Sequence, residues 1–167
     1  MGFFDKLFHK EEESQVPAEP KLFAPATGEA IPLDQVKDPA FGQGILGQGI
    51  GLKPAEGKIF APCDATVAQM FDTGHAVSLE TSFGAEVLIH VGLDTVELKG
   101  QGFKVHAKAG DKVKKGQLLI EFDIPAITAA GYDVTTPMVV CNSDDYSEVK
   151  THTGAVTNAD VVIELEK

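Results

Sequence analysis

Positive charge is scarce in this sequence. Its 167 residues include 14 Lys and Arg against 25 Asp and Glu, which gives a formal net charge of −11 at pH 7. A nucleic-acid-binding surface needs clustered basic residues, so this balance argues against that function. An acidic chain favours solubility and attracts basic partners or basic patches on partners.

Long apolar runs and closely spaced cysteines are also missing. No stretch is apolar over the roughly 20 residues that a membrane-spanning helix needs, and we find no secretory signal pattern. The two cysteines, Cys63 and Cys141, lie far apart in the sequence. We therefore expect a cytoplasmic protein with two reduced, mostly buried thiols.

A long helical period is absent, whereas turn-forming residues are abundant. With 17 Gly and 9 Pro between short runs of Val, Ile, Thr and Phe, the sequence predicts many short strands joined by turns. It therefore predicts an all-β fold, an antiparallel β-sandwich or partly closed barrel with at most short helical turns. The expected elements include strands at 103–107, 117–122, 137–141 and 161–165, and a helical turn at 125–131.

The first 20 residues are predicted to form a mobile tail and an acidic linker. Residues 11–20 are acidic and contain proline, as linkers do. Residues 1–10 fit a frayed tail, a helix that packs on the domain, or a short amphipathic helix that contacts the inner face of the membrane weakly. The apolar side chains at helical spacing are Phe3, Phe4, Leu7 and Phe8. We expect one folded domain at 21–167.

Two further sequence patterns, a short repeat and a glycine-rich segment, indicate structural features and not a functional site. Residues 23–28 (FAPATG) resemble residues 60–65 (FAPCDA), which suggests two similar strand-turn elements around a pseudo-symmetric core. Residues 42–51 contain five glycines, but neither a helix-forming run nor a GK[ST] signature follows them. We interpret these glycines as loop and strand-bend residues and not as a phosphate cradle.

Residues 73–94 carry the strongest local indication of a site, because they predict a β-hairpin with a histidine at the outer end of each arm. The arms are residues 76–79 and 86–89. Residues 82–84 form the turn, where glycine adopts positive φ without steric cost.

Two registers of this hairpin are open. A two-residue turn would place His75 directly opposite His90 on one face of the sheet. A three-residue turn with a bulge at Gly84 would shift the pairing by one residue, and the same-face argument would fail. We favour the first register, because two imidazoles that meet are chemically useful.

A pair of imidazoles supports three kinds of chemistry. His75 and His90 could ligate zinc, act as an acid and base, or divide a phosphoryl transfer, one as nucleophile and one as hydrogen-bond donor. Thr73 precedes His75 by two residues, so its hydroxyl group could hold the orientation and tautomer of that ring. We expect the remaining histidines to have no role in a site. They are His9, His106 and His152.

The sequence around the hairpin resembles a known family. The runs His75-Ala76, 87–100 (VLIHVGLDTVELKG) and Gly102-Phe103 are closely similar to the glucose-type enzyme IIA of the bacterial phosphoenolpyruvate-dependent sugar phosphotransferase system. The likeness extends over nearly the whole chain, from residues 1–7 (MGFFDKL) to the final strand.

The resemblance implies a role for each matching residue. His90 matches the histidine that the phosphocarrier protein HPr phosphorylates on Nε2. His75 matches the partner that stabilises the phosphoryl group, and Thr73 matches the residue that orients that partner. The family then passes the phosphoryl group to a cysteine on the IIB domain of a sugar permease. The positions that match flanking acids and an apolar docking ring are Asp38, Asp94, Phe41, Ile45, Leu46, Phe71 and Val96.

This role requires no cofactor, although zinc could bind His75 and His90 in a complex. Phosphorylation of His90 could also switch the choice among regulatory target proteins.

The residues themselves leave two other classes of protein open. Residues 109–117 look like a turn of biotinyl or lipoyl carrier domains, but no hairpin presenting a modifiable lysine is found. His90 and Asp94 give the His-x-x-x-Asp of lysostaphin-type zinc peptidases, but the later His-x-His of that family is missing.

Overall fold

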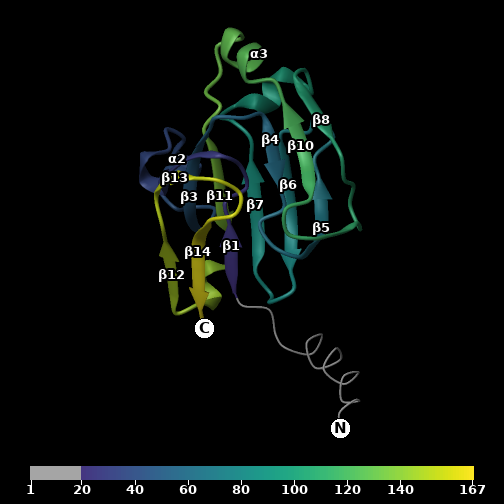
Figure 1. Cartoon of the computed structure of the whole chain (residues 1–167). Helices are drawn as coiled ribbons and strands as arrows, with labels where there is room; N and C mark the ends of the chain where they lie inside the picture. Colours follow the sequence, from purple (N-terminus) through teal and green to yellow (C-terminus); the bar gives the residue numbers. More distant parts are fainter. Residues whose placement is uncertain (1–19) are drawn as a thin grey trace.

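The computed structural model describes residues 20–167, which form an antiparallel β-sandwich (Figure 1). The predicted tail at 1–20 therefore lies outside the described residues, except for Pro20. No helix in the described part is long and apolar enough to cross a membrane. Both ends of the described chain lie at one end of the molecule, and the helix α3 (Ile124–Ala129) lies at the other (Figure 1).

The described strands are arranged in three sheets, and every paired neighbour is antiparallel. The largest sheet has eight strands in the order β13 (Gly154–Val156), β2 (Gly28–Pro32), β3 (Gln48–Pro54), β11 (Thr136–Val140), β7 (Glu86–His90), β6 (Ala76–Thr81), β5 (Ala65–Met70) and β9 (Lys112–Val113). A three-stranded sheet has the order β1 (Lys21–Phe23), β14 (Val161–Glu166) and β12 (Glu148–Thr151). The other has the order β4 (Lys58–Phe60), β10 (Leu118–Phe122) and β8 (Phe103–Val105).

The predicted fold class is confirmed as a sandwich, and the described strands do not close into a barrel. The predicted strands at 103–107, 117–122, 137–141 and 161–165 correspond to β8, β10, β11 and β14, with ends that differ by up to two residues. The predicted helical turn at 125–131 corresponds to α3. These segments were recognisable because each apolar run is bounded by glycine, proline or charged turn residues.

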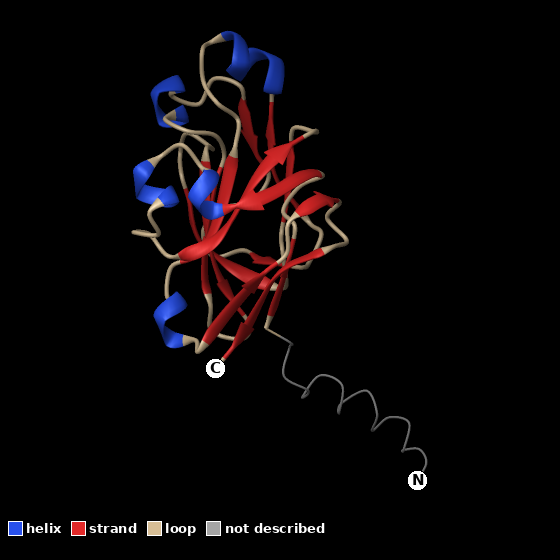
Figure 2. Cartoon of the chain, turned by 90° about the vertical axis from the view of Figure 1, so that its left-hand side faces the viewer, coloured by secondary structure: helices blue, strands red, loops and turns tan. Residues whose placement is uncertain are grey.

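Within residues 20–167, helical structure is confined to short segments around the sheets (Figure 2). Besides α3 they are η1 (Leu33–Gln35), α2 (Pro39–Gly42), η2 (Thr95–Leu98) and η3 (Ser143–Asp145). The helix α2 begins where the Asp38 side chain accepts a hydrogen bond from Ala40 N–H at 2.9 Å and Pro39 occupies the first turn. Such capping satisfies a backbone donor that the helix itself leaves free.

The main core lies between the sheets, and a second, smaller cluster lies on the outer face of the eight-stranded sheet. Fully buried side chains of the main core include Leu22, Ile50, Leu79, Ile89, Leu119, Met138 and Ile163. The smaller cluster consists of Val36, Phe41, Leu93 and Val139. Val139 belongs to it because side chains of a strand alternate between faces. This smaller cluster packs Phe41 of α2 against Leu93 of the chain that leaves β7.

The repeated sequences at 23–28 and 60–65 lie side by side. Phe23 N–H donates to the carbonyl oxygen of Pro62 at 2.9 Å, and Phe60 N–H donates to the carbonyl oxygen of Pro25 at 2.7 Å. Each repeat thus supplies one donor and one acceptor to the other. This reciprocity is what a local two-fold relation produces, in agreement with the predicted pseudo-symmetry.

Candidate active site

The predicted hairpin is formed by β6 and β7, but its register differs from the one we favoured. Ala76, and not His75, is opposite His90, and Val77 pairs with Ile89. Thr81 N–H donates to the carbonyl oxygen of Ala85 at 3.0 Å, so the turn has three residues. Gly84 has φ +89. A left-handed glycine that closes a three-residue turn makes a bulge, which accounts for the one-residue shift.

The two histidines meet despite this shift. His75 precedes the first residue of β6, and Val91 N–H donates to its carbonyl oxygen at 2.6 Å. Because His75 lies beyond the strand, after Gly74 with φ +75, the alternation of the pleat does not dictate where its ring lies. The ring centroids of His75 and His90 are 5.0 Å apart, with an interplanar angle of 78°. The predicted pair of imidazoles is therefore present, although the pairing argument for it was wrong.

The half-buried ring of His90 has one of its two nitrogens engaged in a hydrogen bond. Its Nδ1 lies 2.8 Å from the carbonyl oxygen of Gly92. A carbonyl oxygen only accepts, so Nδ1 carries the proton and Nε2 of the neutral ring keeps its lone pair. Burial lowers the pKa of His90, although the Gly92 carbonyl and the carboxylates of Asp38 and Asp94 act in the opposite direction. The neutral ring with a free Nε2 is the nucleophilic form.

His75 is more enclosed, with only 4% of its surface exposed. Its Nδ1 is hydrogen-bonded to the hydroxyl group of Thr73, as the spacing predicted. Burial and the neighbouring His90 lower the pKa of His75 to about 4. The Phe71 ring packs against it at a centroid distance of 5.4 Å. His75 is thus neutral near pH 7 in the free protein, and its Nε2 is left for a ligand.

The low pKa of His75 makes stability depend on pH. In the unfolded chain this imidazole takes up a proton near its reference pKa of 6.5, but the folded chain resists doing so until about 4. The stabilisation is therefore complete above pH 6.5 and is lost as the pH falls toward 4. Between pH 7 and pH 5 we expect His75 to account for a loss of about 1–2 kcal/mol in the free energy of unfolding. Urea unfolding at the two pH values measures this loss of free energy. The His75→Gln variant should lose correspondingly less free energy of unfolding than the wild-type protein. An equal loss in both proteins would contradict the assignment.

The predicted docking residues differ in how much of their surface is exposed. Ile45, Leu46 and Val96 expose 69%, 38% and 47% of their surface, which is unusual for large apolar side chains and is typical of a docking surface. Phe71 is half-buried. Phe41 is only 3% exposed, and its ring lies 5.3 Å from that of His90. Phe41 therefore supports the His90 ring and offers little surface to a partner.

The two acidic residues reach the site through short helical turns. Asp38 precedes α2, and Asp94 precedes η2 with φ +61, a left-handed conformation that Asp adopts more readily than most residues. Both carboxylates contribute to the electrostatic environment of His90.

Sequence reasoning missed two parts of the site. It did not foresee the role of the Gly92 carbonyl oxygen, which selects the His90 tautomer. It also missed Asp133, whose carbonyl oxygen accepts a hydrogen bond from Leu93 N–H at 2.9 Å. The positive φ of Gly92, +80, was within reach of a sequence argument about glycine. The contact with Asp133 spans 40 residues and had no local signal.

Gly92 can be tested against a matched glycine. A Cβ at Gly92 would lie 2.5 Å from Thr95 Cγ2 and 2.9 Å from the Asp133 carbonyl oxygen, at a backbone φ of +80. We expect Gly92→Ala to lower the free energy of unfolding by about 2–4 kcal/mol, since strain and a clash add. Gly110 also has a positive φ, +93, but nothing lies within 4 Å of its Cβ position. Gly110→Ala should cost only about 1 kcal/mol. Equal losses in urea unfolding would contradict the packing argument.

The histidine pair supplies two ligands for zinc, fewer than a zinc site needs from protein. Among residues 20–167 no group of three or more His, Cys, Asp and Glu side chains is arranged to hold a metal ion.

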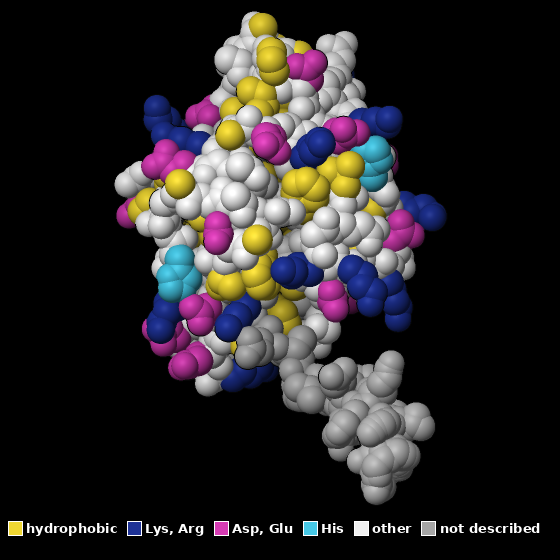
Figure 3. Space-filling model, viewed as in Figure 1, with side chains coloured by type: hydrophobic (Ala, Val, Ile, Leu, Met, Phe, Trp, Pro, Cys, Tyr) yellow, Lys and Arg dark blue, Asp and Glu magenta, His cyan; other side chains and the backbone are white. Residues whose placement is uncertain are grey.

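The other described histidines, His106 and His152, are each hydrogen-bonded to a glutamate. His106 Nε2 lies 2.7 Å from a Glu121 oxygen, and His152 Nε2 lies 2.6 Å from a Glu164 oxygen. The face shown in Figure 3 carries lysine and acidic side chains intermixed, together with histidines. His106 and His152 thus each have a glutamate as hydrogen-bond partner.

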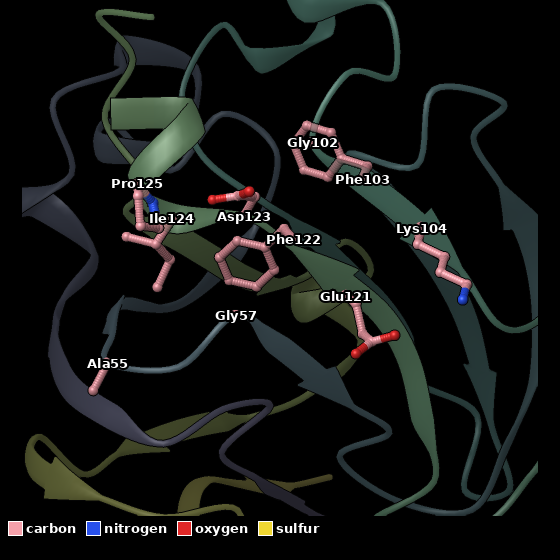
Figure 4. Close-up of a pocket in the computed structure, with 10 residues that line it drawn as sticks. All are labelled: Ala55, Gly57, Gly102, Phe103, Lys104, Glu121, Phe122, Asp123, Ile124 and Pro125. Carbon is pink, nitrogen blue, oxygen red and sulfur yellow. The ribbon is translucent and has the colours of Figure 1, made fainter. Parts of the chain in front are cut away.

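A cavity of about 750 Å³ lies where β10 ends and β8 begins (Figure 4). Apolar side chains and three charged ones line it, and none of its lining residues is a histidine. They are Ala55, Gly57, Gly102, Phe103, Lys104, Glu121, Phe122, Asp123, Ile124 and Pro125. The histidine pair therefore does not line this cavity.

Comparison with known proteins decides the family. Residues 20–146 match the family described as phosphoenolpyruvate-dependent sugar phosphotransferase system, EIIA 1. The chain belongs to this family. It is 45% identical over 147 residues to the glucose-specific EIIA component of Oceanobacillus iheyensis, with 88% of each chain covered. It also matches the structure of glucose permease IIA from Mycoplasma capricolum with a TM-score of 0.80 and 30% identity, covering 87% of this chain and 95% of that one.

Family membership confirms the glucose-type enzyme IIA that the motif around His90 indicated, and it removes the support for the carrier-domain and zinc-peptidase alternatives. Some relatives are much longer. The chain is 54% identical over 129 residues to the β-glucoside-specific EIIBCA component of Dickeya chrysanthemi, covering 77% of this chain but 20% of that protein. The family is one of phosphotransfer in sugar transport, and its EIIA unit occurs both alone and joined to EIIB and EIIC.

Proposed function

We propose that this EIIA protein carries a phosphoryl group on Nε2 of His90, accepting it from phosphorylated HPr and passing it to the IIB domain of a sugar permease in the cytoplasm. The observation that carries the proposal is the hydrogen bond from His90 Nδ1–H to the Gly92 carbonyl oxygen. It leaves Nε2 as the nucleophilic nitrogen of a neutral ring.

In the first step the Nε2 lone pair attacks phosphorus in line. The new bond forms between Nε2 and phosphorus, while the bond from phosphorus to the donor breaks and its electron pair stays with HPr. The His90 ring becomes cationic, and its Nδ1–H bond to Gly92 persists through the step. Little covalent chemistry falls to the other residues, so positioning and charge stabilisation dominate.

His75 is suited to the stabilising role. We infer that the Thr73 hydroxyl group donates to Nδ1, so that Nε2–H of the neutral ring donates to a phosphoryl oxygen. The 5.0 Å separation of the two ring centroids leaves the phosphoryl group within reach of both imidazoles. As negative charge gathers on the phosphoryl oxygens, His75 can also become cationic by taking up a proton from solvent on Nδ1, from which the Thr73 hydroxyl group then accepts.

The surroundings of the pair favour protein partners. Exposed Ile45, Leu46 and Val96 give an apolar contact surface, and the carboxylates of Asp38 and Asp94 can pair with basic side chains of HPr. A IIB domain is supported as the acceptor because relatives of this chain contain EIIB in the same polypeptide. In the second step a IIB cysteine thiolate attacks phosphorus, the P–N bond breaks, and its electron pair returns to Nε2.

One experiment tests this function directly. The protein is incubated with phosphoenolpyruvate, enzyme I and HPr, and its intact mass is measured. We expect a gain of one phosphoryl group that is labile in acid and stable in base, and its loss when a IIB domain is added. A mass that stays unchanged with the complete donor system would refute the proposal.

A further inference from the structure

The peptide group between Gly92 and Leu93 makes hydrogen bonds on both sides. Its carbonyl oxygen accepts from His90 Nδ1 at 2.8 Å, and its N–H donates to the carbonyl oxygen of Asp133 at 2.9 Å. Because a peptide group is planar and rigid, the second bond restrains the direction of the first. The Asp133 carbonyl group thus helps to orient the Gly92 carbonyl oxygen, which keeps the proton on Nδ1 of His90.

Asp133 is itself held by Thr135. One carboxylate oxygen, Oδ1, accepts from Thr135 N–H at 2.8 Å and from the Thr135 hydroxyl group at 2.7 Å. Burial alone would raise the pKa of Asp133, but these two bonds, with the charges of Lys37 and Lys53, lower it. Thr135 is 6% exposed, so water replaces its hydrogen bonds poorly. Residues 133–135 form a turn that lies between α3 and β11. This turn is far in sequence from the histidine hairpin.

The approach of this turn to Gly92 is close. An added Cβ at Gly92 would lie 2.9 Å from the Asp133 carbonyl oxygen, so the two backbones touch without an intervening side chain. A shift of Asp133 would therefore be transmitted to the Gly92–Leu93 peptide directly.

We propose that Asp133 and Thr135 are positioning residues for His90, which hold the Gly92 carbonyl so that Nδ1 stays protonated and Nε2 stays the nucleophile. Neither residue contacts the imidazole or the phosphoryl group. The catalytic use of this tautomer rests on the function proposed above, whereas the tautomer itself can be measured without any phosphoryl donor.

The test uses the full chain, two substitutions of Asp133 and one of Asp160. Asp133→Ala removes both bonds from Thr135, whereas Asp133→Asn keeps an acceptor oxygen in the same place. Asp160→Ala is the matched control, since its carboxylate also accepts from a threonine, Thr157 N–H at 2.8 Å, and its carbonyl oxygen accepts from Ala24 N–H at 2.8 Å. We measure the His90 tautomer by ¹⁵N NMR, the hydrogen exchange of the Leu93 amide, and the rate of phosphoryl uptake from HPr.

We expect wild type, Asp133→Asn and Asp160→Ala to keep the proton on Nδ1. In Asp133→Ala the Nε2–H form should become readily detectable, the Leu93 amide should exchange roughly tenfold faster, and uptake should slow by about tenfold, which is the size of effect expected from one hydrogen bond. An Asp133→Ala protein with the wild-type tautomer and Leu93 protection would overturn the proposal, as would the same change in Asp160→Ala.

If Asp133→Ala does not fold, Thr135→Val and Thr135→Ser make the same comparison. Valine removes the hydroxyl bond to Asp133 and serine retains it, so only the valine variant should alter the tautomer and the Leu93 exchange. Identical spectra of these two variants would count against the proposal. A wild-type protein that shows Nδ1–H but takes up no phosphoryl group would refute the proposed function and leave this positioning role intact.

Discussion

His90→Ala should fold as the wild type does and take up no phosphoryl group from HPr. The reason is that Nε2 of His90 is the proposed nucleophile, and no other side chain at the site offers a neutral nitrogen with its second nitrogen held by a backbone carbonyl. Loss of the nucleophile in a covalent mechanism removes the intermediate and does not merely slow its formation. We expect the intact mass to stay unchanged over times at which the wild-type protein is fully converted.

The fold should survive because His90 is half-buried at the end of β7. The alanine variant loses the ring contact with Phe41 and the bond to Gly92, which should cost about 1–2 kcal/mol of the free energy of unfolding. His106→Ala is the control, since it removes a histidine whose partner is the surface residue Glu121, and it should be phosphorylated normally. A His90→Ala protein that gains one phosphoryl mass at the wild-type rate would reject His90 as the acceptor.

His75→Gln should separate acceptance from onward transfer. Glutamine keeps a hydrogen-bond donor at about the position of the imidazole, so the variant should still accept a phosphoryl group from HPr. It cannot become cationic, and we expect transfer to the IIB domain to slow by roughly 10²–10³-fold, the usual effect of losing one group that stabilises transition-state charge. Phosphohistidine at His90 should therefore accumulate when the permease domain is added.

The two steps are measured separately, uptake by intact mass and discharge by the rate at which added IIB domain removes the label. His152→Gln is the matched control, because it makes the same substitution at a histidine paired with Glu164. Peptide mapping that places the phosphoryl group on His75 of the wild-type protein would reverse the roles. Failure of His75→Gln to accept any phosphoryl group would mean that both imidazoles act in the first step.

The strand pattern could be predicted because its signals are local. Apolar runs such as residues 137–141, bounded by turn residues, identify a strand without knowledge of its neighbours. The hairpin with a histidine at each outer end was predicted from the same local signals. The residues around His90 indicated the family by their resemblance to it. The register did not follow, because both turn types suit the sequence SFG and differ by one hydrogen bond.

The amino-acid sequence by itself determined the all-β class, the hairpin that carries His75 and His90, the Thr73 contact two residues away, and the family. The tertiary structure supplied the physical reason why Nε2 of His90 is the free nitrogen, since this depends on the Gly92 carbonyl and, through Leu93, on Asp133. It also decided that Phe41 supports the His90 ring from a buried position while Ile45 and Val96 stay exposed. The physical reason is that burial and tautomer are set by contacts between segments distant in sequence, on which local propensity has no bearing.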